Sequence, residues 1–104
     1  MVEILQATTP TFQITVPSFV DLSSVRNLCF SLEQNKVTKI NKYSDSLTID
    51  GRVVSVFLTQ IETMQLVGGQ ATIMLNWLYE DGSRGGTYPV TITVIENLLK
   101  EVMT

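Results

Sequence analysis

The sequence contains no histidine and only one cysteine among 104 residues. Histidine is the commonest general base, metal ligand and catalytic-triad partner, so its absence removes the usual routes to acid–base, metal and triad chemistry. The single cysteine, Cys29, can form neither an internal disulfide nor a zinc site. Its position in an apolar-rich segment favours a small buried thiol. The sequence therefore predicts a protein that is not an enzyme, has no catalytic or metal-binding residues and uses no cofactor.

Charged residues are also scarce. They make up 16% of the chain and give a formal net charge of −3, whereas about 25% is typical. Only Lys36, Lys39 and Lys42 cluster, so the cationic surface that nucleic acids require is missing. A neutral surface rich in Thr, Ser, Gln and Asn suits packing against other proteins. The same composition also arises simply because β-proteins favour threonine over lysine and glutamate.

Long hydrophobic runs are absent too. No apolar run reaches the roughly 18 residues that a membrane span needs. The first six residues lack the basic and apolar regions of a signal peptide. We therefore expect synthesis in the cytosol without membrane insertion, and we expect residues 1–104 to form one domain, with a C-terminal tail at 95–104.

What the sequence does contain is alternation with a period of two. Between residues 71 and 79 every second side chain is large or apolar, a glycine-rich bend follows at 80–86, and alternation resumes over 88–94. This pattern predicts two antiparallel strands that bury one face. The residues predicted on the inward face include Leu75, Trp77, Tyr79, Tyr88, Val90 and Ile92.

Shorter alternating segments separated by turn formers predict further strands. These cover residues 11–16, 25–32, 37–43, 47–49 and 53–58, with the lysine-rich segment 37–43 as an exposed edge. Thr59 and Glu62 have the spacing of a capping box and predict a short helical turn near 59–66. The chain is therefore expected to be all-β: an immunoglobulin-like antiparallel β-sandwich of about seven strands.

The period changes at the C-terminus. Ile95, Leu98, Leu99 and Val102 follow the i, i+3, i+4, i+7 spacing of an amphipathic helix, so a short helix is expected over 95–104. A helix of this length is too short to be stable alone. It would therefore dock either on its own sandwich or on a partner.

Few residues remain as candidates for chemistry or binding. Asp45, Asp50 and Asp81 are explained as turn formers. Tyr43 and the inward aromatic residues could stack against sugars, although core packing also explains the inward ones. Apolar residues on outward faces and in the tail indicate contacts with a partner. These candidate partner-binding residues are Phe57, Met74, Leu78, Leu98, Leu99 and Val102.

Several segments taken together resemble a known group of proteins. They are 9–16, 20–23, 47–51, 54–63 and 80–84, and Leu58-Thr59-Gln60-Ile61-Glu62-Thr63 is the most distinctive part. They are similar to small proteins encoded in the structural-gene regions of tailed phages and prophages of gut Firmicutes. More loosely, they resemble the N-terminal sandwich domain of phage baseplate upper proteins.

The resemblance implies a virion component made in the host cytoplasm, a small all-β protein of the head, tail or baseplate that assembles in many copies. Its partners would be other virion proteins or further copies of itself. The resemblance carries over no catalytic residues. Two other functions stay open. One is an immunoglobulin-like module that binds a carbohydrate or host surface through Tyr43 and the 80–86 loop. The other is a small phage-encoded inhibitor of a host defence protein.

Overall fold

A computed structural model of the chain describes residues 2–104 and contains mainly β-strands. In chain order the elements are β1 (Glu3–Leu5), β2 (Thr11–Thr15), η1 (Leu22–Ser24), β3 (Val25–Gln34), β4 (Val37–Tyr43), η2 (Ser44–Ser46), β5 (Thr48–Asp50), β6 (Val53–Phe57), α1 (Gln60–Met64), β7 (Gly69–Tyr79), β8 (Arg84–Gly86) and β9 (Val90–Ile95).

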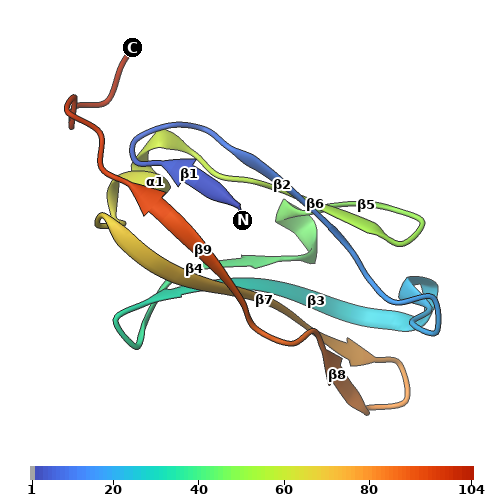
Figure 1. The fold of residues 1–104 in the computed structure, drawn as a ribbon. Coiled ribbons are helices and arrows are strands. Elements are labelled where there is room, and N and C mark those ends of the chain that lie inside the picture. The colour runs from blue at the N-terminus through green and yellow to red at the C-terminus, as the bar shows by residue number, and fades with distance from the viewer. Residues whose placement is uncertain (1) are drawn as a thin grey trace.

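The strands form two sheets that lie one above the other (Figure 1). The large sheet has the order β1-β9-β7-β3-β4, with β8 paired to β7, and the small sheet has the order β2-β6-β5. Only β1 and β9 pair in parallel within residues 2–104. The orders β9-β7-β3-β4 and β2-β6-β5 match strands GFCC′ and BED of variable-type immunoglobulin domains. The immunoglobulin-like sandwich is confirmed, with nine strands in residues 2–104 rather than about seven.

Alternate residues of both sheets fill the space between them. Phe12 of β2 and Phe30 of β3 stack across this space, with ring centroids 6.0 Å apart and planes inclined by 27°. Antibody domains join strands B and F here through a disulfide, which a chain with a single cysteine cannot form. Apolar packing therefore holds these sheets together. Fully buried members of the core include Leu28, Phe30, Leu32, Val54, Val56, Leu58, Leu75 and Ile92.

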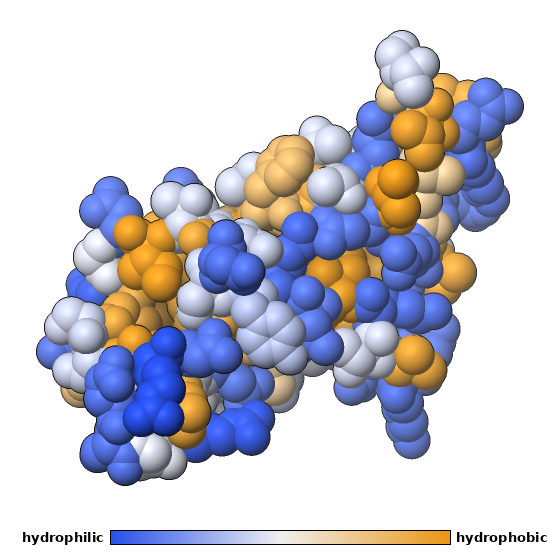
Figure 2. Space-filling view, turned by 180° about the vertical axis from the view of Figure 1, so that it is seen from behind, coloured by the Kyte–Doolittle hydropathy of each residue, from blue (hydrophilic) through white to orange (hydrophobic). Residues whose placement is uncertain are grey.

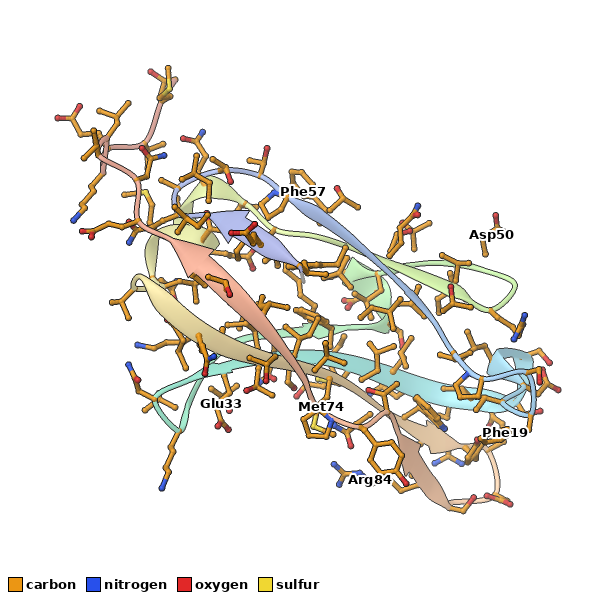
Figure 3. The ribbon with its side chains drawn as sticks, viewed as in Figure 1. Phe19, Glu33, Asp50, Phe57, Met74 and Arg84 are labelled. Carbon is orange, nitrogen blue, oxygen red and sulfur yellow. The ribbon has the colours of Figure 1, made fainter. Side chains whose placement is uncertain are left out.

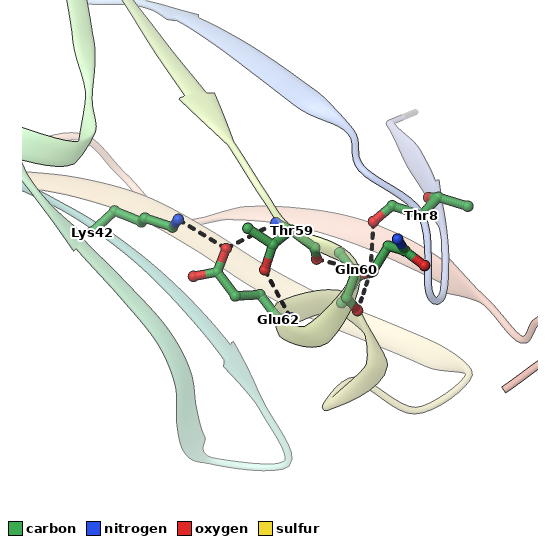
Figure 4. Close-up of polar contacts among 6 residues, drawn as sticks. Thr8, Lys42, Thr59, Gln60 and Glu62 are labelled. Carbon is green, nitrogen blue, oxygen red and sulfur yellow. Dashed lines mark hydrogen bonds and ion pairs between the residues drawn. The ribbon is translucent and has the colours of Figure 1, made fainter. Parts of the chain in front are cut away.

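The short helix α1 begins as the sequence predicts. The Glu62 N–H donates to Thr59 Oγ1 at 3.2 Å, and the Thr59 N–H donates to Glu62 Oε1 at 2.9 Å (Figure 4). These reciprocal bonds satisfy two backbone donors that a helix start leaves without partners. The predicted capping box is confirmed, and Gln60–Met64 forms the helix.

Strand β4 is an edge strand, as predicted, but one of its lysines does not point to solvent. Lys42 lies opposite Phe30, whose side chain faces the core. Directly opposite residues share a face, so Lys42 also points inward, and its side chain is only 15% exposed. Its ammonium lies 2.8 Å from Glu62 Oε1 (Figure 4). The prediction of an exposed Lys42 was wrong, although an inward charge still protects a sheet edge.

The predicted hairpin at 71–94 is interrupted. Trp77 pairs with Gly85 on β8, but Ile73 pairs with Val90 on β9, so the register shifts by one residue between β8 and β9. Tyr88 lies in this break and is 91% exposed, and Val90, although opposite Ile73, is 51% exposed at the rim of the sandwich. Their predicted place in the core was wrong because an extra residue in one strand bends it and disrupts its pairing.

The predicted helix at 95–104 was also wrong. Strand β9 continues to Ile95, whose carbonyl accepts from the Gln6 N–H at 2.9 Å, and Asn97 Nδ2 donates to the Gln6 carbonyl at 2.9 Å. Leu99 N–H then donates to Asn97 Oδ1 at 3.0 Å in a local turn. These bonds hold the start of the tail against the end of β1. The remaining residues are too few to form a helix without support.

Candidate functional site

The outer face of the large sheet contains a hollow of about 380 Å³. Its centre is occupied by two small side chains of β3, Cys29 and Ser31. Cys29 pairs with Tyr43 on one side and Asn76 on the other, while Ser31 pairs with Asn41. Small side chains in the middle of a sheet face, flanked by larger ones, leave a depression. The hollow is also lined by Asn27, Leu28, Trp77, Leu78 and Arg84.

Internal hydrogen bonds fix three asparagines of this hollow. Asn41 Oδ1 accepts from Ser31 Oγ at 2.7 Å, and Asn76 Oδ1 accepts from Arg84 Nη2 at 3.3 Å. Asn27 Oδ1 accepts from the Leu28 N–H at 3.0 Å. A carboxamide whose oxygen is held in this way keeps two N–H donors on its nitrogen. The hollow therefore presents several oriented donors.

The charge in the hollow has one sign. Arg84 is the one charged side chain that lines it within residues 2–104, and no Asp or Glu does. Arg84 donates to Asn76 and forms no ion pair with the described residues. Arg26 of β3, by contrast, forms an ion pair with Glu80, at 3.7 Å. The hollow thus has an unpaired guanidinium beside neutral donors.

Sequence reasoning found part of this hollow. As one alternative, Tyr43 and the 80–86 loop together were the predicted contact for a carbohydrate or host surface. Tyr43, which is 51% exposed, and Arg84 of that loop both line the hollow. The prediction that Cys29 is buried was wrong, because it lies on the outer face and is half-buried. Asn41 and Asn76 were missed. The alternation of the strands could have revealed them, because it places both asparagines on the same outward face as Cys29 and Leu78.

A second, apolar depression opens along one edge of the sandwich. This groove, of about 640 Å³, lies between β2 and the segment that joins β8 to β9. It contains inward side chains of β2 and exposed side chains of the loops, among them Phe19, which is 86% exposed. Apolar residues that line it include Phe12, Ile14, Phe19, Met74, Tyr88 and Val90.

Strand edges border this groove. In the part of the chain that the structure describes, β6 pairs with one edge of β2 and no strand pairs with the other. Strand β1 pairs with β9 only from Thr93 to Ile95, so it does not extend beside Val90. A free edge next to an apolar groove offers main-chain hydrogen bonds together with side-chain pockets.

The six candidate partner-binding residues lie in separate places. Phe57 is on the outer face of the small sheet, and Met74 lies on the opposite side of the molecule (Figure 3). Met74 lines the groove, whereas Leu78 lines the hollow. Leu98, Leu99 and Val102 belong to the C-terminal segment, which projects from the body and carries hydrophobic side chains (Figure 2). The structure therefore does not combine the six into one surface.

The carboxylates of the turns have structural partners. Asp81 Oδ1 accepts from the Ser83 hydroxyl at 2.6 Å and from its N–H at 2.8 Å, and these bonds lower the pKa of Asp81 below its ordinary 3.8. Asp21 makes the same contacts with Ser23, which lower its pKa as well. Across residues 2–104 no cluster of three or more His, Cys, Asp or Glu could hold a metal ion. Nor is any helix of this region long and apolar enough to cross a membrane.

Comparison with known proteins bears on the fold only. No protein-family model matches the sequence, and neither does any curated protein. Among solved structures, a provisionally assigned glycoside hydrolase from Bacteroides vulgatus ATCC 8482 aligns over 93% of this chain with a TM-score of 0.55 and 11% identity, and the chain spans 17% of that protein. Murine CRIg aligns over 92% of this chain and 91% of its own, with a TM-score of 0.46 and 14% identity. The V domain of amphioxus IgVJ-C2 aligns over 89% and 98%, with a TM-score of 0.39 and 11% identity. The strand order of the two sheets, rather than these alignments, identifies the chain as an immunoglobulin-like β-sandwich.

Proposed function

We propose that this chain is a non-enzymatic structural protein of a bacteriophage virion that acts by packing against neighbouring protein subunits. The observation that carries the proposal is the apolar groove beside the free edge of β2. Contiguous exposed apolar surface rimmed by polar residues commonly marks a site of protein association.

The occupant that suits the groove is an extended segment of a neighbouring subunit. Such a segment would add a strand to the small sheet by pairing with β2 and would place alternate side chains between Phe12, Tyr88 and Val90. Pairing would satisfy the backbone groups along the edge of β2, and side-chain burial would remove the exposed rings from water. The resemblance of the sequence to phage structural proteins supplies the virion context.

A pair of variants tests this function in a phage that encodes the chain. Purified particles should contain the protein, as detected by mass spectrometry. Val90→Lys places a charge at the rim of the groove and should prevent incorporation. Ile49→Lys is the matched control, because Ile49 is 43% exposed on β5 and does not line the groove. Both side chains can reach water, so neither change should unfold the domain.

Two results would contradict the proposal. Particles that form normally and lack the chain would refute a structural role in the virion. Equal incorporation of the Val90→Lys and Ile49→Lys proteins would show that the groove is not where the neighbouring subunit packs.

A further inference from the structure

We propose that the hollow on the outer face of the large sheet binds an acidic saccharide, with Arg84 contacting the carboxylate and the fixed asparagines contacting ring hydroxyls. This inference goes beyond the assembly function and does not depend on it, because the hollow and the groove are separate depressions. It assigns a ligand class to a site at which Tyr43 and Arg84 converge.

Arg84 determines the charge of the ligand. Its guanidinium is exposed and donates to Asn76 Oδ1, and the described residues provide no acidic partner for it. The planar guanidinium matches a carboxylate in a two-bond arrangement. A phosphate group is a poorer match, because phosphate sites usually combine a cation with several converging backbone N–H groups at a helix start or loop, and this hollow lies on paired strands.

The asparagines favour a ligand that carries several oxygen acceptors besides its carboxylate. Their carboxamide oxygens accept from Ser31, Arg84 and the Leu28 N–H, so their nitrogens keep the donors. They lie on three different strands, β3, β4 and β7. Donors spread around a depression match hydroxyl oxygens spread around a sugar ring. A simple carboxylate would engage Arg84 and leave the other donors unused.

Size and apolar surface agree with a sugar unit. The volume of about 380 Å³ is near the lower end of ligand pockets, which span roughly 300–1,000 Å³. Tyr43 is 51% exposed and borders one side of the hollow, and Leu78 borders the other. An aromatic ring at the side of a polar pocket can cover the C–H face of a saccharide. The small centre at Cys29 and Ser31 leaves room for the ring to approach the sheet.

Cys29 supplies a direct assay, because it is the only cysteine of the chain and lines the hollow. The rate of alkylation of the folded protein by N-ethylmaleimide would be measured with D-glucuronate, D-glucose or acetate. At about 10 mM, a ligand with a Kd of about 1 mM occupies most sites. We expect D-glucuronate to slow alkylation about fivefold or more at this occupancy, and D-glucose and acetate to have little effect.

Matched variants then test the roles of the two side chains. Arg84→Gln should raise the Kd for D-glucuronate about tenfold or more, since it removes a hydrogen bond between charged groups, and should leave about twofold protection or less at about 10 mM. Arg26→Gln is its control, because Arg26 lies outside the hollow. Tyr43→Ala should weaken protection, whereas Tyr88→Ala should not, because Tyr88 lies on the groove. Circular dichroism of each variant would establish that the fold is retained.

Several results would overturn the proposal. The first is that D-glucuronate gives no protection. The second is that D-glucose protects equally well, which would show that the charge has no role. The third is that acetate protects equally well, which would reduce the site to a carboxylate contact. Loss of protection in Arg26→Gln as large as that in Arg84→Gln would also refute it. None of these results bears on incorporation into particles, so failure here and failure of the assembly function are distinguishable.

Discussion

Gly85 allows Trp77, the only tryptophan of the chain, to lie against β8. An alanine at position 85 should displace the indole or β8. Gly85 pairs with Trp77, whose side chain is only 4% exposed. A Cβ at position 85 would overlap Trp77 Nε1 and would lie 2.9 Å from Cε2. Carbon and nitrogen atoms that are not bonded cannot approach so closely, so either the indole or β8 must move. The indole N–H also has no hydrogen-bond acceptor among the described residues to hold it in place.

The magnitude follows from the cost of overfilling a packed site. Such changes typically cost about 1–3 kcal/mol, which corresponds to a fall in Tm of about 5–20 °C for a domain of this size. Tryptophan fluorescence reports the change directly, because Trp77 is the only tryptophan. We expect Gly85→Ala to lower the urea midpoint and to shift the emission maximum to longer wavelength, as the indole becomes more exposed to water.

Gly68→Ala is the matched control. A Cβ at Gly68 would meet Glu96 Cβ at 3.5 Å, an ordinary contact. This change should leave the emission maximum unchanged and stability within about 1 kcal/mol of the parent, since alanine also lowers the entropy of the unfolded chain. If Gly85→Ala had the same urea midpoint and emission maximum as Gly68→Ala, the packing of Trp77 against β8 would be refuted.

Three further predictions concern α1 and the tail. Thr59→Ala removes the cap and should lower the free energy of unfolding in urea by about 1 kcal/mol; an unchanged midpoint would contradict this. Burial opposes ionisation of Glu62, but hydrogen bonds from Lys42 and the Thr59 N–H outweigh it and lower its pKa below the ordinary 4.5. The stability that ionised Glu62 contributes is therefore complete above about pH 4.5, and it is lost as the pH falls through the lower pKa of Glu62 in the folded state. Glu62→Gln should reduce the loss of Tm on acidification, and an equal loss in both proteins would argue against the prediction. Asn97→Ala removes both the 2.9 Å bond to the Gln6 carbonyl and the acceptor of the Leu99 N–H. It should speed amide exchange at Leu99 with little change in Tm, whereas slow exchange would show that other contacts hold the tail.

Local patterns in the sequence determined most of the strands and their inward faces. Alternation placed Leu28, Phe30 and Leu32 on one face of β3, and the structure buries all three. The Thr59 and Glu62 capping box was equally readable, because it depends on residues three apart. These features are local, since side-chain direction in a strand has a period of two and a helix start is defined by its first turn.

Only the tertiary structure decided which strands became neighbours, and this produced each correction. The inward direction of Lys42 follows from its pairing with Phe30, and the exposure of Tyr88 follows from a one-residue shift between β8 and β9. The tail is non-helical because Gln6, 91 residues away, bonds to Asn97. The candidate site has the same origin. Asn41 and Tyr43 are distant in sequence from Asn76 and Arg84. Strand pairing brings the two pairs together, because backbone hydrogen bonds between strands do not depend on the spacing of residues along the chain.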